Sequence, residues 1–167
     1  GRSKNSIENH FDHDPELYRA LQEANKTDLL QELNFDAALK THFFYTRQRL
    51  QKGLGDAILC AENFAGEEPF VVALGDSILG LNADSRAVSR MAEVFAEKRA
   101  SCVIAVEEVP REETHHYGVI QPETVSGSVC RVVNLVEKPS PQEAPSNLAI
   151  AGRYIFSPLI FDMIRRV

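Results

Sequence analysis

The sequence predicts an α/β protein with a Rossmann-like mixed, mostly parallel sheet that is flanked by helices. Short apolar segments alternate with segments of helical periodicity, and several of the apolar segments are continuous. A continuous apolar strand is typical of a sheet that is covered on both faces. The 167 residues are enough for one core, so we expect a single domain over residues 1–167.

The first part of the chain predicts helices followed by one strand. Asp14 before Pro15 is typical of an N-cap with proline at the first helical position, and apolar residues follow at helical spacing. "DLLQEL" gives a second helical piece. "HFFYTR", residues 42–47, is aromatic and β-prone and predicts a strand. "DAILCAENF", residues 56–64, returns to helix.

The second part alternates strands and helices. Its first strand, Phe70 to Leu74, is short and apolar and stops at a Gly-Asp pair. A helix is expected near residues 85–100, because apolar residues recur on one stripe. The remaining expected elements are a strand at 101–109, a hairpin over 124–139, a strand at 148–156 and a helix that Ser157 and Pro158 open.

Composition and charge exclude several classes of protein. The net charge is −6, which argues against nucleic acid as a partner, because phosphate backbones recruit basic faces. No apolar run approaches the ~20 residues that cross a membrane, and no signal peptide is evident, so we expect a cytoplasmic protein. The three cysteines are odd in number and widely spaced, which fits neither a disulfide framework nor a zinc site. Cys60 and Cys102 have apolar neighbours and are expected to be buried free thiols.

Asp76 is the first candidate for chemistry. In an open α/β sheet, ligands bind beyond the carboxyl ends of the strands, and the strand "FVVAL" delivers Gly75 and Asp76 to that edge. Asp76 is either a turn former or a carboxylate ligand for Mg²⁺, which takes oxygen ligands and often keeps waters. One carboxylate is enough for Mg²⁺ if phosphate oxygens supply other ligands.

The stretch "RQRLQKGLGDAILCAENF" raises a second possibility. Gly53 and Gly55 let another molecule approach the backbone closely, or they form only a connection into a helix. Asp56 at the helix start is expected to cap the helix itself and to repel an anion, which disfavours a pyrophosphate cradle. A neutral nucleobase fits better, and the amide of Gln48 offers both a donor and an acceptor for reading it.

"LVEKP" places Glu137 and Lys138 at a strand end before a proline. The lysine is suited to hold a phosphate and the glutamate to accept hydrogen bonds from sugar hydroxyls, unless the two form only a solvated charge pair. His115 and His116 are adjacent, and neighbours on an extended chain point to opposite faces, so we expect a surface loop rather than a metal site.

Read together, these segments resemble the bacterial-type UTP–glucose-1-phosphate uridylyltransferases of the sugar-nucleotide pyrophosphorylase, or nucleotidyltransferase, superfamily. The resemblance covers nearly the whole chain and is carried by "RQRLQKGLGDAILCAENF", "EEPFVVALGDSIL" and "VEKP…EAPSNLAIAGRYI", among others. It implies the nucleotide-diphospho-sugar transferase fold and a single nucleotidyltransferase domain.

The resemblance also implies a reaction, in which UTP and glucose 1-phosphate give UDP-glucose and pyrophosphate with Mg²⁺ as cofactor. Nucleotide binding then belongs to Gln48 and Gly53, and Asp76 is a catalytic residue and the metal ligand. Lys138 is expected to hold the phosphate of glucose 1-phosphate as the second catalytic residue. The sugar side is completed by Gly118, Glu137 and Ile150. No membrane is expected as a partner, and relatives suggest a homo-oligomer.

The chain departs from the family pattern in four ways. The opening strand and glycine-rich loop of the family are not in it, and a second metal-binding Asp is expected beyond Val167. Ser77 stands where a second acidic residue is frequent, and Asp56 where histidine is frequent. We therefore expect an incomplete, central fragment that is inactive alone. Two alternatives stay open at this stage, a non-catalytic sugar-nucleotide-binding paralogue and thymidylyl or cytidylyl transfer to a sugar 1-phosphate.

Overall fold

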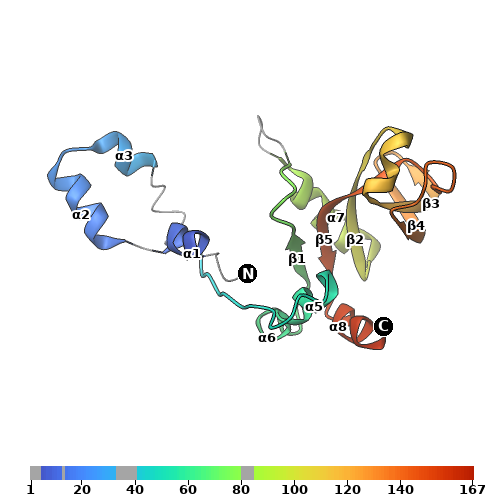
Figure 1. Cartoon of the computed structure of the whole chain (residues 1–167), viewed down its shortest axis with the longest axis horizontal. Coiled ribbons are helices and arrows are strands. Elements are labelled where there is room, and N and C mark those ends of the chain that lie inside the picture. The colour runs from blue at the N-terminus through green and yellow to red at the C-terminus, as the bar shows by residue number, and fades with distance from the viewer. Residues whose placement is uncertain (1–4, 13, 33–40, 80–84) are drawn as a thin grey trace. The chain divides into compact units, whose positions relative to one another are not determined.

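The computed structural model describes residues 5–12, 14–32, 41–79 and 85–167 (Figure 1). Contacts group the chain into two compact units, residues 1–61 and 62–167. The expectation of one domain over residues 1–167 stays a prediction. Among the described residues, no helix is both long and apolar enough to cross a membrane.

The first unit contains short helices. They are α1 (Asn5–Phe11), α2 (Pro15–Glu23), α3 (Thr27–Glu32) and α5 (Leu54–Leu59). The expected cap of α2 is confirmed, because the Asp14 carboxylate accepts hydrogen bonds from the backbone N–H groups of Glu16 and Leu17 at 3.1 and 2.9 Å.

The strand that we expected at residues 42–47 is wrong, because this segment has neither helix nor strand structure. Its side chains contact α1 instead of entering a sheet. The Phe43 ring stacks on Phe11 with centroids 4.7 Å apart, and Arg47 forms an ion pair with Glu8. A β-prone composition forms a strand only where a partner edge is available, and contacts with a helix are the competing outcome here.

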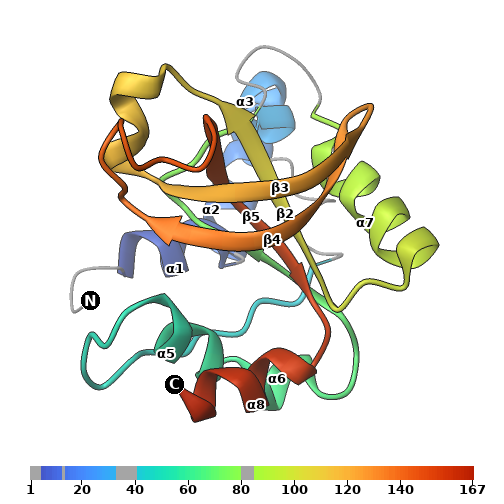
Figure 2. The same cartoon turned by 90° about the vertical axis from the view of Figure 1, so that its right-hand side faces the viewer.

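The second unit holds a five-stranded sheet (Figure 2). Its strands are β1 (Phe70–Ala73), β2 (Cys102–Glu108), β3 (Gly118–Ser126), β4 (Val129–Glu137) and β5 (Leu148–Phe156). Its helices are α6 (Glu62–Ala65), α7 (Ala87–Lys98), the 3₁₀ helix η1 (Arg111–His116) and α8 (Leu159–Arg166). The helix expected at residues 56–64 is therefore two helices, because Cys60 ends α5 before α6 begins.

The α/β class is confirmed, but the expectation of a mostly parallel sheet is wrong. Every strand pairing among the described residues is antiparallel. β1 and β2 do run in the same direction, as a β-α-β reading predicts, since both are antiparallel to β5. They do not pair with each other, because β5 lies between them and comes from far along the chain.

One part of the core of this unit forms where α7 packs on β2 and β5. Met91 and Val94 are the buried residues of α7, and Ile155 and Phe156 are buried on β5. The Phe161 ring of α8 stacks on Phe70 of β1, with ring centroids 5.2 Å apart and planes 8° apart. Aromatic stacking therefore fixes α8 at the start of β1.

A bulge at Gly152 interrupts β5. The pairing of β2 with β5 shifts between Ile104 and Val106, and Gly152 has φ +66 there. A Cβ on Gly152 would lie 2.5 Å from the Ser77 Oγ and 3.4 Å from the Leu74 Cβ. Glycine is thus required both by its backbone angle and by the close approach of the loop after β1.

We expect Gly152→Ala to lower the free energy of unfolding by roughly 2–4 kcal/mol, since it adds left-handed strain and overpacking. Gly127→Ala is the matched control, because its φ of +62 is similar and nothing lies within 4 Å of the added Cβ. Urea denaturation followed by circular dichroism measures both. An equal loss of unfolding free energy in the two variants would show that the contact of the added Cβ with Ser77 does not destabilise the protein.

Candidate functional site

The loop after β1 carries Asp76, and Arg153 of β5 holds that loop. Arg153 Nη1 donates to the Leu74 carbonyl at 2.9 Å, and Nη2 donates to the Ser77 carbonyl at 2.6 Å. The Leu74 N–H donates to the Gly152 carbonyl at 3.0 Å. The backbone on both sides of Asp76 is therefore fixed, while the Asp76 side chain stays exposed.

Lys138 follows β4 in an unusual backbone conformation. Its φ is +47, and its N–H donates to the Tyr117 carbonyl at 2.9 Å. Left-handed backbone angles are costly for a lysine and persist only where the surroundings enforce them, often at functional sites. Glu137 and Lys138 are both exposed at this strand end.

Three of the predicted sugar-binding residues come together at Gly118. Gly118 pairs with Glu137 across the β3–β4 hairpin. A Cβ on Gly118 would lie 3.1 Å from the Ile150 Cδ1 and 3.2 Å from the Glu137 Oε2. The bare backbone of Gly118 therefore lies between a carboxylate and an apolar side chain, which is suited to a hydroxylated ring that presents both polar and apolar surface.

Tyr154 relates this group to Asp76. Burial raises the pKa of the Tyr154 hydroxyl, and the charges of Glu137, Cys102 and Asp76 raise the pKa further. Asp76 and Glu137 therefore both lie within electrostatic range of one phenol. The Tyr154 ring stacks on the ring of Phe156, also on β5, with centroids 5.6 Å apart, and this contact orients the Tyr154 side chain.

The sequence did not lead us to Arg153 or Tyr154. Their only signal was the presence of two polar side chains in the apolar segment "LAIAGRYIF". A charged residue in such a strand needs partners inside the fold, and for Arg153 these are carbonyls that lie 76 and 79 residues away in the sequence.

In the first unit, Gln48, Gly53 and Asp56 form a hydrogen-bonded group. Gln48 Nε2 donates to the Asp56 Oδ2 at 2.7 Å and to the Gly53 carbonyl at 3.1 Å. Gly53 has φ +96 and precedes α5, so a residue with a side chain would be strained there. We expected Asp56 to cap α5, but its carboxylate accepts a hydrogen bond from the Gln48 amide instead.

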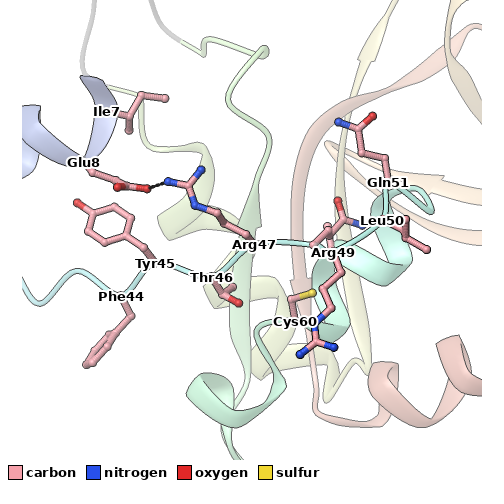
Figure 3. A pocket seen from close by; sticks show the side chains of 12 residues that line it. Ile7, Glu8, Phe44, Tyr45, Thr46, Arg47, Arg49, Leu50, Gln51 and Cys60 are labelled. Atoms are coloured by element: carbon pink, nitrogen blue, oxygen red, sulfur yellow. Dashed lines mark hydrogen bonds and ion pairs between the residues drawn. The ribbon is translucent and has the colours of Figure 1, made fainter. Parts of the chain in front are cut away.

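Gln48 also lines an open pocket of about 990 Å³ within the first unit. Figure 3 shows the Arg47 guanidinium paired with Glu8 on one side of it. Ala57 of α5 and Cys60, which ends α5, also line it. The pocket is large enough for a nucleoside-sized molecule.

The adjacent histidines were expected to lie on a surface loop. They lie in η1, where their rings are 3.9 Å apart between centroids, so the extended chain that we assumed is wrong, but both are exposed as expected of a surface segment. Within the described ranges, no three His, Cys, Asp or Glu side chains gather as a metal-binding cluster. Asp76 is accordingly not part of such a cluster among the described residues.

Comparison with known proteins identifies the family. The model of the nucleotidyl transferase family matches residues 4–167. A UTP–glucose-1-phosphate uridylyltransferase of Bacillus subtilis is 48% identical over 161 residues, which are 96% of this chain and 54% of that protein. A Staphylococcus epidermidis protein of the same name is 46% identical over 164 residues, covering 98% of this chain and 56% of that one. The chain thus spans about half the length of the curated relatives it matches.

Solved structures agree with the sequence relatives. An apo UDP-glucose pyrophosphorylase superposes with a TM-score of 0.88 at 36% identity, over 98% of this chain and 59% of that one. A UDP-glucose pyrophosphorylase complexed with UDP-glucose gives 0.85 at 36% identity, over 100% and 60%. A UTP-bound UGPase from Acinetobacter baumannii gives 0.82 at 33%, over 95% and 56%. With a family model that matches nearly its whole length and these relatives in sequence and fold, the chain belongs to the nucleotidyl transferase family.

Proposed function

We propose that this chain carries substrate-binding residues of an enzyme that makes UDP-glucose and pyrophosphate from UTP and glucose 1-phosphate. Its relatives at 46–48% identity are named as UTP–glucose-1-phosphate uridylyltransferases, and two structural neighbours hold UDP-glucose and UTP. Those names favour the transferase over a non-catalytic binding paralogue.

The packing around Gly118 is the observation that carries the proposal on the sugar side. The Glu137 carboxylate and the Ile150 side chain approach the same bare Cα, at 3.2 and 3.1 Å from the place of a Cβ. A glucose ring that lies against this group of residues would meet an acceptor for its hydroxyls and an apolar face. The Lys138 ammonium, next in the chain, would pair with the sugar phosphate as a compact charge.

Asp76 fits a Mg²⁺ ion that keeps waters and takes phosphate oxygens as further ligands. Its carboxylate is exposed, and its backbone is held by Arg153 and Gly152. Mg²⁺ typically binds through one or two carboxylates plus substrate phosphates, so a single Asp is a sufficient donor from this unit. The bound ion would neutralise charge that develops on the phosphates.

The base of the nucleotide is assigned to Gln48 and Gly53 in the first unit. An amide with fixed partners and a glycine backbone without a Cβ can both approach a flat, neutral ring.

In the proposed reaction, a phosphate oxygen of glucose 1-phosphate forms a bond to the α-phosphorus of UTP as the bond to pyrophosphate breaks. Asp76, Lys138 and the base-binding residues act by positioning the substrates and by electrostatic stabilisation, without a covalent enzyme intermediate.

The direct test is pyrophosphate release from UTP and glucose 1-phosphate by the protein of the native reading frame. We expect Asp76→Asn to lower kcat/KM by roughly 10²-fold or more, because the metal loses its carboxylate ligand. Asp162→Asn on α8 is the matched control, since its carboxylate is also exposed. Unchanged turnover of the Asp76 variant would overturn the assignment. The same assay tests our expectation that the 167 residues alone are inactive.

A second prediction separates the charge of Lys138 from its backbone strain. We expect Lys138→Gly to raise the KM for glucose 1-phosphate at least tenfold, because a paired phosphate loses its cation. The same variant should leave the free energy of unfolding unchanged or raise it by up to ~1 kcal/mol, because glycine relieves the left-handed φ.

Arg99→Gly is the matched control for that variant, since Arg99 has the same φ of +47 and is exposed at the end of α7. It should show the same effect on stability with unaltered kinetics. Lys138→Met should lose the phosphate contact and retain the strain. A KM that changes in neither Lys138 variant would place the phosphate elsewhere.

A further inference from the structure

The amide of Gln48 has a fixed orientation. Its Nε2 atom donates to the Asp56 Oδ2 at 2.7 Å and to the Gly53 carbonyl at 3.1 Å. A primary amide has only two N–H groups, and a carboxylate and a backbone carbonyl can only accept. Both N–H groups of Gln48 are therefore used within the protein, and the opposite orientation of the amide would place its oxygen against two acceptors.

It follows that Gln48 has an acceptor, the Oε1 atom, left for a ligand. Gln48 lines the open pocket of the first unit, so a small molecule can reach it. An acceptor that cannot turn into a donor selects ligands by their hydrogen-bonding edge. It binds an N–H group and disfavours a lone pair, because two acceptors would then face each other in a partly buried place without a hydrogen bond.

Asp56 is the stronger of the two anchors. Its bond to Gln48 is the shorter one, and a hydrogen bond to a carboxylate is stronger than one between neutral groups. The Gly53 carbonyl is shared, because it also accepts the Ala57 N–H at 3.3 Å. The carboxylate of Asp56 therefore decides which way the Gln48 amide faces.

We infer that Asp56 is a positioning residue that acts through Gln48 to make the site accept a pyrimidine base with hydrogen on N3 and reject cytosine. The inference rests on the proposed assignment of the nucleotide base to Gln48. Uracil carries an N3–H donor that matches the free Oε1, and so does 5-methyluracil. Cytosine has a lone pair at N3, so two acceptors would face each other.

The first experiment uses the unaltered protein of the native reading frame and leaves its residues in place. Calorimetric titration compares UTP, 3-methyl-UTP, 5-methyl-UTP and CTP. We expect 3-methyl-UTP and CTP to bind at least tenfold more weakly than UTP, because a site built for a donor rejects an analogue without it. The 5-methyl compound is the matched control for the added methyl group and should bind like UTP. Equal binding of UTP and 3-methyl-UTP would overturn the inference.

The second experiment tests the role of Asp56. Asparagine at this position can turn its own amide and donate to Gln48, which lets the Gln48 amide reverse and present N–H. We expect Asp56→Asn and Asp56→Ala each to lower the UTP-to-CTP ratio of affinities, and of kcat/KM values, about tenfold. Asp56→Glu keeps the carboxylate and should retain much of the preference. Asp28→Asn, an exposed carboxylate of the same unit, is the control.

The outcomes separate this inference from the proposed function. A protein that makes UDP-glucose and keeps its UTP-to-CTP ratio in both Asp56→Asn and Asp56→Ala disproves the role of Asp56 and leaves the transferase standing. A protein without turnover disproves the transferase, and the binding ratios still decide the inference. A role of Asp56 in folding alone would weaken UTP and CTP binding equally, which also overturns it.

Discussion

The position of β5 between β1 and β2 is the constraint on which the second unit depends. β5 pairs with β2 along nearly its whole length, with β1 at its end and with β3 near its start. One strand thus presents Ile150 to Gly118 and aims Arg153 at the loop after β1. The bulge at Gly152 makes this possible, because Leu74 and Ser77 approach the strand so closely that a Cβ on residue 152 would clash with Ser77.

The sequence predicted elements better than it predicted their pairing. The apolar run of β1, the stripe of α7 and the apolar run of β5 all gave elements close to their observed bounds. Periodicity reports which face of an element is buried, and it contains no information on which strand lies beside it. The parallel direction of β1 and β2 was therefore predictable, whereas the insertion of β5 from about 75 residues further along was not. Residues 42–47 failed for the same reason, since a strand needs an edge to pair with.

The candidate site divides in the same way. Asp76, Glu137 and Lys138 stand at strand ends, where the general rule for α/β sheets and the family resemblance both direct attention. Arg153 and Tyr154 were missed because their importance lies in tertiary contacts, with carbonyls and charges that the linear sequence separates. Asp56 was noticed for its charge, which predicts that no phosphate binds at that place. Its hydrogen bond to Gln48, eight residues away, depends on side-chain orientation that no spacing rule supplies.

The proposed metal-binding loop of the second unit and the proposed base-binding group of the first unit follow one physical logic, although they use different bonds. Arg153 donates hydrogen bonds to the Leu74 and Ser77 carbonyls on either side of Asp76, so that the loop is held in place while the Asp76 carboxylate remains exposed for a ligand. Asp56 and Gly53 accept hydrogen bonds from both N–H groups of Gln48, so that only its amide oxygen remains to bind a ligand. In each case, hydrogen bonds within the protein hold the segment or side chain and leave the group that would face the substrate. Such a group needs no reorganisation when the substrate arrives, which is why preorganised polar groups favour both selectivity and rate.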